Sequence, residues 1–264
     1  MALRLLVTRP QPQADAWVAR LRTQGIEAVA LPLLAIDAVV DLGELHAAWR
    51  DLPRYALVLF VSPNAVSHFF AARPAELAAR GWPAGTRAGA TGPGTLQALQ
   101  RAGVPATLCV APPCDALQFD SAALWAQLRD ETWTGREVLV LRGDGGRDEF
   151  AGYLRAAGAA VRFTQAYHRG PARLSATEQA LLASAIARPA RHLWWLSSAE
   201  AVGYLPQLAP QADWRDACAL ASHPRIAARA REVGFGLVFE APPTLDAVHA
   251  ALVRIEACLQ SLPP

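Results

Sequence analysis

The sequence contains no lysine, because all 25 basic residues among its 264 are arginine. This excludes enzymes that form a Schiff base through lysine, pyridoxal-phosphate enzymes with an internal lysine, and proteins with a Walker-type phosphate loop. An excess of charge of either sign is also lacking, since the formal net charge is +2. So small a net charge produces a weak electrostatic field, which predicts neither nucleic acid nor a membrane as a partner.

Clustered metal ligands and long apolar runs are also missing. The four cysteines form no C-x-x-C pair and the six histidines form no H-E-x-x-H or H-x-H cluster, so no metal site is expected. Arg4 and Arg9 interrupt the apolar opening segment, which is too short for the core of a signal peptide. No apolar run approaches the length of a membrane helix. We therefore expect a cytoplasmic protein with reduced thiols.

Hydrophobic residues are plentiful, at 53% against 18% charged residues, as in a protein with a packed core. Short apolar runs alternate with longer helical patterns, which predicts an α/β fold with parallel sheets. The predicted strands are Leu3–Thr8, Glu27–Leu31, Tyr55–Val61, Thr86–Thr91, Ala106–Val110, Glu137–Leu141, Ala160–Tyr167, His192–Leu196, Cys218–Ala221 and Gly236–Phe239. The clearest predicted helices are Gln11–Gln24, Leu96–Ala102 and Arg147–Ala157, each followed by a glycine.

An internal repeat spans about half the chain. The same 133 positions separate Arg9 from Arg142 and Gly25 from Gly158, so the register holds across a whole β-α-β unit. Three further segments recur in the same order: LVLFVSPNAV as LWWLSSAEAV, AGATGPGTLQALQRAG as CALASHPRIAARAREVG, and VAPPCD as EAPPTLD. The repeat predicts two similar domains, and a ligand is expected between them.

Four strand-to-helix junctions carry hydroxyl, glycine, proline or other small residues, beginning at Val61, Thr91, Ser197 and Ser222. In one interpretation, serine and threonine merely cap the following helices. In the other, these helix N-termini bind anions, which the recurrence in both halves favours. The candidate binding residues are Ser62, Asn64, Ala65, Gly92, Thr95, Ser198, Ala199, Ser222, His223 and Arg225.

Arginines and one tyrosine stand at the ends of other strands. Arg9, Arg142 and Arg147 are interpreted either as carboxylate-binding residues or as members of ion pairs. The glycine-rich segment around Arg142 is no dinucleotide fingerprint, because Asp148 stands where its last glycine is needed. Tyr167 is either a packing residue or a proton donor, since an ordinary phenol is protonated at neutral pH.

Taken together, these segments resemble the uroporphyrinogen-III synthase family. The resemblance covers almost the whole chain and rests on the order and spacing of VTRPQPQADAWVARLRTQGIEAVALPLLAI, LFVSPNAV, GPGTLQALQRAG, VLRGDGGRDEFAGYLRAAGAAV with AYHR, WWLSSAEAV and SHPRIAARAREVG. It implies two similar α/β domains, each a parallel sheet flanked by helices, joined by a two-stranded linker. One domain would comprise residues 1–35 plus 172–264 and the other residues 38–165, with linkers near 36–37 and 166–171.

The resemblance also implies a reaction. Members of this family cyclise hydroxymethylbilane to uroporphyrinogen III, with loss of water and inversion of ring D through a spiro intermediate, in tetrapyrrole and haem biosynthesis. They use no cofactor and act on a polycarboxylate tetrapyrrole. A monomer is expected, with a possible transient handover of substrate from the preceding pathway enzyme.

Residue roles follow by position. Tyr167 matches the family tyrosine proposed to assist departure of the hydroxyl group, and Ser62, Thr95 and Ser198 match junction residues that line the cleft. The sequence departs from the family pattern in two places. The fourth junction has Ile226 where many relatives have a threonine, so Arg225 is the candidate carboxylate ligand there. In addition, His168 separates Tyr167 from the arginine that often follows the tyrosine directly in relatives.

A second hypothesis is a two-domain ligand-binding module of the periplasmic-binding type. It would also hold a small anionic ligand in a hinged cleft. The absence of a signal segment argues against the secreted form, and the absence of a helix-turn-helix extension argues against a repressor.

Overall fold

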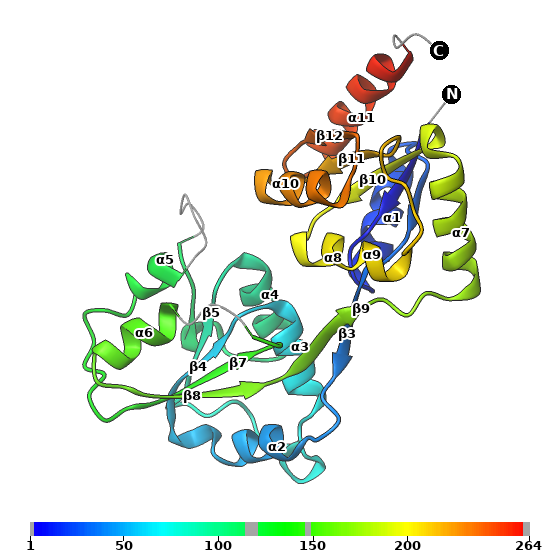
Figure 1. The fold of residues 1–264 in the computed structure, drawn as a ribbon. Helices are drawn as coiled ribbons and strands as arrows, with labels where there is room; N and C mark the ends of the chain where they lie inside the picture. The colour runs from blue at the N-terminus through cyan, green and yellow to red at the C-terminus, as the bar shows by residue number, and fades with distance from the viewer. Residues whose placement is uncertain (1–2, 114–120, 146–148, 261–264) are drawn as a thin grey trace. The chain divides into compact units, whose positions relative to one another are not determined.

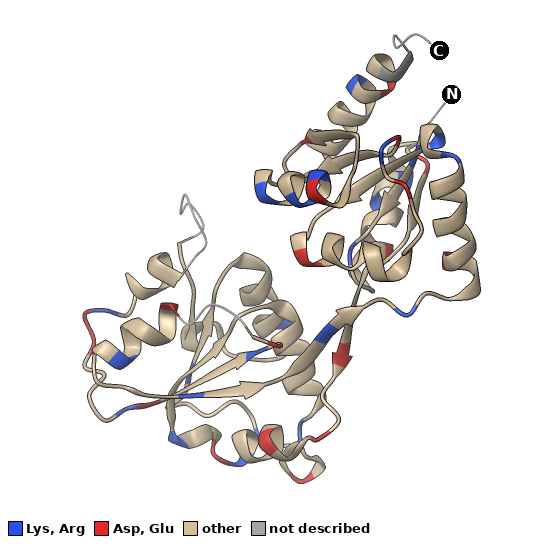
Figure 2. Cartoon of the chain, viewed as in Figure 1, with Lys and Arg blue, Asp and Glu red and all other residues tan. Residues whose placement is uncertain are grey.

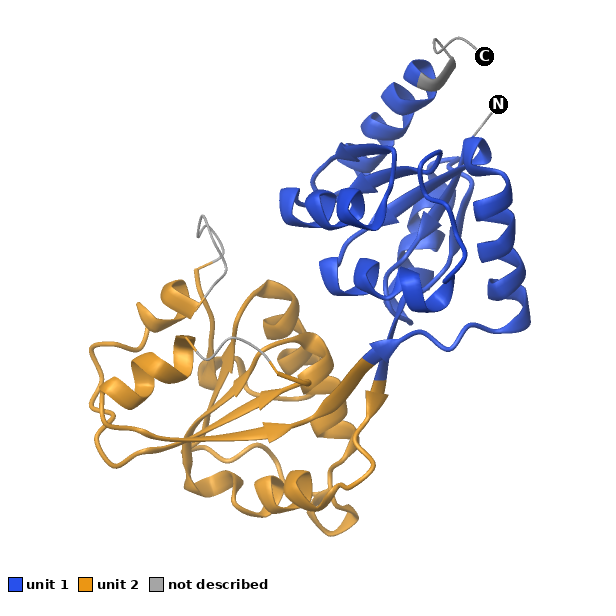
Figure 3. Ribbon diagram, viewed as in Figure 1, with its two compact units in different colours: residues 1–36, 170–264 blue, residues 37–169 orange. Residues whose placement is uncertain are grey.

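The computed structural model describes residues 3–113, 121–145 and 149–260 (Figure 1). The chain divides into two compact units, Met1–Ile36 with Gly170–Pro264 and Asp37–Arg169 (Figure 3). These bounds differ from the predicted domain ranges by at most four residues. The chain passes between the units twice, in strands β3 and β9, which pair in a two-stranded sheet.

The first unit is built on a five-stranded sheet. Its strands are β1 (Arg4–Val7), β2 (Ala28–Ala30), β10 (His192–Leu196), β11 (Cys218–Ala221) and β12 (Leu237–Glu240). Its α-helices are α1 (Gln13–Thr23), α7 (Ala176–Ala187), α8 (Ala199–Gly203), α9 (Leu205–Leu208), α10 (Pro224–Val233) and α11 (Leu245–Gln260), and η4 (Pro189–Arg191) is a 3-10 turn.

The second unit has a sheet of the same size. Its strands are β4 (Tyr55–Phe60), β5 (Arg87–Ala90), β6 (Cys109–Val110), β7 (Glu137–Arg142) and β8 (Ala160–Gln165). Its helices are α2 (Gly43–Arg50), α3 (Pro63–Ala71), α4 (Pro93–Arg101), α5 (Ser121–Trp125) and α6 (Glu149–Ala156), with 3-10 turns η1 (Leu52–Arg54), η2 (Ala75–Leu77) and η3 (Ala106–Leu108). The paired strands at the unit boundary are β3 (Leu34–Ala38) and β9 (Tyr167–Pro171).

The two sheets have equivalent strand orders. The first runs β12-β11-β10-β1-β2 and the second β6-β5-β4-β7-β8, and every neighbouring pair is parallel. The sequence repeat aligns β1 with β7 and β10 with β4, so the orders coincide strand by strand. The prediction of two similar parallel α/β domains is confirmed.

Both faces of each sheet are covered, which explains the continuous apolar strands. In β10, Trp194 belongs to a core cluster with α7, α8, α9 and α10, whereas its neighbours Leu193 and Trp195 belong to a cluster with α1 and α11. Successive side chains of a strand point to opposite faces, so both sets are buried. In the second unit, α5 and α6 pack on one face through Leu124 and Phe150.

Some predicted bounds were wrong. Ala106–Leu108 is a 3-10 turn rather than strand, because Pro105 sets φ to −57° and begins a turn, leaving two residues for β6. The predicted strand Ala160–Tyr167 is two strands, since Ala166 N–H donates to Arg142 O at the end of the ladder and the chain then leaves to pair with β3. The three glycines expected to close helices have positive φ: Gly25 (78°), Gly103 (87°) and Gly158 (90°).

Candidate functional site

A cavity of about 380 Å³ lies in the second unit, beside the carboxyl ends of β4 and β7. It combines a phenol, two guanidinium groups, hydroxyl groups and apolar side chains. Its lining residues are Leu59, Val61, Ser62, Thr91, Ser121, Val140, Arg142, Gly143, Gly145, Glu149, Phe150, Ala151, Phe163, Tyr167 and Arg169. The cavity therefore contains the predicted proton donor and one predicted arginine, with a second arginine that sequence reasoning did not select.

Tyr167 is the first residue of β9 and is 4% exposed. Its hydroxyl lies 3.1 Å from Ser62 Oγ, and its ring stacks on that of His68 with centroids 5.6 Å apart. Burial lowers the pKa of His68, although Asp37 opposes the shift, so the neutral imidazole is favoured against the tyrosine ring. The phenol is thus held at the cavity wall by one polar contact and one ring contact.

Ser62 connects the tyrosine to helix α3. As the N-cap residue, its Oγ accepts a hydrogen bond from Ala65 N–H at 3.1 Å. A hydroxyl has one proton to donate besides its lone pairs, so Ser62 can cap the helix and still donate to the phenol oxygen. Asn64 and Ala65 lie in the first turn of α3, where N–H groups lack intrahelical partners.

Gly143 makes room for the tyrosine ring. A Cβ atom built on this residue would lie 2.6 Å from Cε2 and 2.7 Å from Cζ of Tyr167, closer than real carbon contacts. Any other amino acid at this position would therefore displace the ring.

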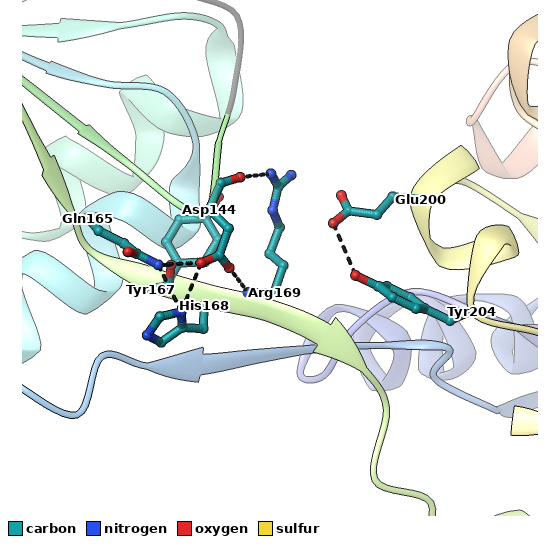
Figure 4. A network of polar contacts seen from close by, with 7 residues as sticks. All are labelled: Asp144, Gln165, Tyr167, His168, Arg169, Glu200 and Tyr204. Atoms are coloured by element: carbon teal, nitrogen blue, oxygen red, sulfur yellow. Dashed lines mark hydrogen bonds and ion pairs between the residues drawn. The ribbon is translucent and has the colours of Figure 1, made fainter. Parts of the chain in front are cut away.

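Asp144 gathers donors from both sides of Tyr167 (Figure 4). One carboxylate oxygen accepts from His168 Nδ1 at 2.8 Å and from Gln165 Nε2, and the other accepts from the backbone N–H of Arg169. The Arg169 guanidinium donates to Asp144 O. Although partial burial raises the pKa of this carboxyl, the Arg169 N–H, His168 and Gln165 outweigh it and lower the pKa overall.

The two cavity arginines are held differently. The guanidinium of Arg142, at the end of β7, lies 4.0 Å from the ring centroid of Phe163, which fixes its plane by a cation–π contact. Arg169 is anchored by its contacts with Asp144. Such planar groups bind carboxylates through paired hydrogen bonds. Elsewhere, acidic and basic residues are interspersed over helices and loops of both units (Figure 2).

The second junction of this unit differs from its prediction. Gly92, not a hydroxyl residue, is the N-cap of α4, and Thr91 Oγ1 instead donates to Val61 O at 3.1 Å. Thr95 is 3% exposed and is not among the residues that line the cavity.

The equivalent junctions of the first unit are capped by two different residue types. Ser198 caps α8 by accepting from Ala201 N–H at 3.2 Å, as predicted. The cap of α10 is His223, not Ser222: its Nδ1 accepts from Arg225 N–H at 3.1 Å, which places the ring proton on Nε2. Three further candidates lie at these helix starts: Ala199 and Ser222 are partly buried, and Arg225 is exposed.

Arg9 follows β1 in the first unit. Its guanidinium carbon lies 5.3 Å from the ring centroid of Trp17 and 5.6 Å from that of Trp195, and its Nε is buried without a hydrogen-bond partner. Burial lowers the pKa of this guanidinium. Arg9 forms no ion pair within the described ranges, so the ion-pair interpretation fails for it. Arg147 lies outside the described residues.

Sequence reasoning also missed Gly143, which lines the cavity, and two residues that contact the segment around Tyr167, Asp144 and His68. Gly143 and Asp144 were noticed only as parts of a failed dinucleotide fingerprint, and no role was assigned to His68. The available signal was their position, since Gly143 directly follows a buried strand. Among the described residues, no three His, Cys, Asp or Glu side chains gather as metal ligands. No described helix has both the length and the apolar character needed to cross a membrane.

Comparisons with known proteins place this geometry in a family. A family model described as uroporphyrinogen-III synthase HemD matches residues 15–250. The uroporphyrinogen-III synthase of Salmonella typhimurium is 32% identical over 177 residues, which cover 67% of this chain and 69% of the relative. That of Escherichia coli is 31% identical over 178 residues, with the same coverage.

Two solved structures share the fold. The uroporphyrinogen-III synthetase from Helicobacter pylori has a TM-score of 0.58 at 15% identity, covering 97% of this chain and 100% of that one. A mutant uroporphyrinogen III synthase from Thermus thermophilus has a TM-score of 0.56 at 18% identity, covering 98% and 99%. Because the family model spans most of the sequence and these two curated relatives exceed 30% identity, this chain belongs to the uroporphyrinogen-III synthase family.

Proposed function

We propose that this chain is a hydro-lyase that cyclises hydroxymethylbilane to uroporphyrinogen III, with loss of water and inversion of ring D, in tetrapyrrole and haem biosynthesis. The family match across residues 15–250 carries the proposal. The cavity of the second unit supports it, because a buried phenol stands beside two guanidinium groups there, as a reaction on a polycarboxylate requires.

In the proposed reaction, Tyr167 donates its phenolic proton to the hydroxyl group that leaves ring A as water. Ser62 lies 3.1 Å from the phenol oxygen and can donate to it as negative charge develops. The substituted α-carbon of ring D then attacks the methylene carbon of the resulting azafulvene, and the new bond forms a spiro intermediate. Fragmentation and reclosure invert ring D, and the proton released on closure restores the phenol, so that water is the one by-product.

Binding is assigned to guanidinium and backbone N–H groups. In the second unit, the proposed carboxylate ligands are Arg142, Arg169 and the helix starts that contain Ser62, Asn64, Ala65, Gly92 and Thr95. In the first unit they are Arg9, Ser198, Ala199, Ser222, His223 and Arg225. Holding the bilane in a fixed conformation favours inversion over the spontaneous closure that yields the symmetrical isomer.

We further propose that the enzyme works without a cofactor, as a cytoplasmic monomer that takes its substrate from the preceding pathway enzyme by transient contact. Sedimentation of the purified chain, alone and mixed with that enzyme, tests the monomeric state and the transient contact. A stable dimer would contradict the monomer.

The activity is tested by incubating the chain with enzymatically generated hydroxymethylbilane, oxidising the products and separating the porphyrin isomers by chromatography. We expect isomer III. A reaction without protein provides the control, since spontaneous closure gives isomer I. Isomer I alone in the presence of the folded chain would contradict the proposed function.

A further inference from the structure

We propose that Asp144 is a positioning residue, whose carboxylate holds the segment on either side of Tyr167 so that the phenol stays at the cavity wall. Its catalytic consequence rests on the proposed function, whereas its effect on the tyrosine does not. The motif that contains Asp144, Arg142-Gly143-Asp144, is the one that failed as a dinucleotide fingerprint.

The contacts of Asp144 bracket the tyrosine in sequence. Gln165 precedes it by two residues, His168 follows it directly, and the backbone N–H of Arg169 lies one residue further on; all three donate to the carboxylate (Figure 4). The ladder between β7 and β8 ends at Gln165, so this segment is leaving the sheet where Asp144 binds it. The carboxylate therefore ties the residues on both sides of the phenol to the segment that follows β7.

The contacts around this carboxylate place a proton on Nδ1 of His168. Gln165 Nε2 lies 2.8 Å from His168 Nδ1, and both atoms contact Asp144 Oδ1. An ionised carboxylate only accepts, so Nδ1 must carry a proton and cannot also accept from Gln165. The two nitrogens are neighbours because both donate to the same oxygen. Three donors thus converge on one charged group, which makes the bonds stronger than neutral ones.

The other copy of the repeat provides an independent observation. With the 133-residue offset, Pro10, Gln11 and Leu34 occupy the positions of Gly143, Asp144 and Tyr167. Leu34 begins β3 as Tyr167 begins β9, so these positions are structurally equivalent. The glycine that admits the ring, the carboxylate that binds the flanking residues and the tyrosine itself occur together in one copy and are all absent from the other. This joint occurrence indicates that they serve one purpose.

The test monitors the environment of the Tyr167 ring directly by fluorine NMR. The chain contains four tyrosines, so 3-fluorotyrosine labelling gives four fluorine resonances, and Tyr167→Phe assigns the one from residue 167. We expect Asp144→Asn to shift or broaden that resonance and leave the other three in place. It should also lower kcat by about tenfold, the loss expected when one or two charge-assisted hydrogen bonds are removed, while KM stays within about twofold.

Asp213→Asn is the matched control. Asp213 also accepts from a backbone N–H two residues ahead and from an arginine side chain, both of Arg215, but it belongs to the other unit. It should leave the Tyr167 resonance and kcat unchanged. Asp144→Glu keeps the charge and should retain more of the kcat than Asp144→Asn.

Combination with Tyr167→Phe separates positioning from a general structural effect. If Asp144 acts through the phenol, Asp144→Asn lowers kcat no further in the Tyr167→Phe background. Fully additive losses, or a resonance that stays in place in folded Asp144→Asn, would overturn the proposal. Failure of the wild-type chain to form isomer III would instead refute the proposed function, and the fluorine spectra would still decide whether Asp144 positions the tyrosine.

Discussion

At the scale of single residues, the hydroxyl group of Tyr167 is the part of the side chain that the proposed reaction uses. Tyr167→Phe removes it and keeps the ring stacked on His68. Ser62 retains its bond from Ala65 N–H, so no buried group is left unsatisfied and the loss of unfolding free energy should not exceed about 1.5 kcal/mol. We expect kcat to fall by about 10²-fold or more, as is typical when a general acid is removed.

Initial rates with enzymatically generated hydroxymethylbilane and a thermal melt of the same preparation measure the two quantities. A nearly normal kcat in the folded Tyr167→Phe protein would show that the phenol is dispensable.

The charge of Arg9 lacks full hydrogen bonding in the folded chain, so a bound carboxylate would stabilise it. Its Nε is buried without a hydrogen-bond partner, which costs about 1–3 kcal/mol, and its contacts with Trp17 and Trp195 return about 0.5–2 kcal/mol. Arg9→Met should therefore change the unfolding free energy by less than about 1 kcal/mol in either direction. KM should rise, because a carboxylate ligand is lost.

Urea unfolding and substrate saturation curves measure these effects. Arg4→Met provides a control, since Arg4 pairs with Glu27 at the surface. Strong destabilisation of Arg9→Met with an unchanged KM would assign Arg9 to packing alone.

At the scale of helices and strands, the parallel sheets are predictable because both of their faces are buried. A strand such as His192–Leu196 is then apolar at nearly every position, and the pattern needs no tertiary information. The residue pattern alone did not predict strand β3 (Leu34–Ala38), and the resemblance implied only a linker near 36–37. Most residues of β3 are only partly buried, so it lacks the continuous burial that marks the strands of the two parallel sheets.

The candidate site was predictable to a smaller extent. Ser62 and Ser198 could be identified as caps, because a serine between a strand and a helix satisfies local N–H groups. That His223 rather than Ser222 caps α10 depends on how the imidazole turns, which the sequence does not specify. The role of Gly143 depends on a ring that arrives from residue 167, so only the folded chain reveals it.

A comparison of two helix-capping serines distinguishes an effect on stability from an effect on activity. Ser62→Ala and Ser175→Ala each remove an N-cap side chain, from α3 and α7, and should each lower the unfolding free energy by about 1 kcal/mol. Ser62 also contacts the Tyr167 hydroxyl, so Ser62→Ala alone should reduce kcat. Denaturant titrations and initial rates on both variants make the comparison. Equal kcat values in the two variants would contradict a role for Ser62 beyond capping.

At the scale of the whole molecule, the internal repeat gives two sheets that share one strand order but differ in the residues at their strand ends. Each unit has an arginine at the equivalent strand end, Arg9 or Arg142, next to aromatic rings. The tyrosine occurs in one unit, since Leu34 occupies its place in the other. The proposed anion-binding arginines thus occur in both copies of the repeat, whereas the proposed proton donor occurs in one.

Each unit also contains a histidine whose pKa is lowered, which predicts how the stability of the whole chain depends on pH. Burial lowers the pKa of His68 against the opposing effect of Asp37. Burial likewise lowers that of His192; its bond to the Arg188 carbonyl and the charge of Glu27 oppose the shift, and the charges of Arg4 and Arg188 add to it. Each folded-state pKa lies below the ordinary 6.5, so the unfolded chain binds protons first as the pH falls.

The unfolding free energy should therefore be nearly constant between about pH 7 and about pH 7.5 and decrease below about pH 6.5, by at most about 1.4 kcal/mol per pH unit for each histidine. Urea unfolding between about pH 7.5 and about pH 5 measures the slope. His192→Gln cannot titrate, so it should show a shallower slope than the wild type even if it is less stable at every pH. Stability that is constant or increases on acidification would contradict the prediction, because the partly buried His68 and the buried His192 both favour the neutral form in the folded chain.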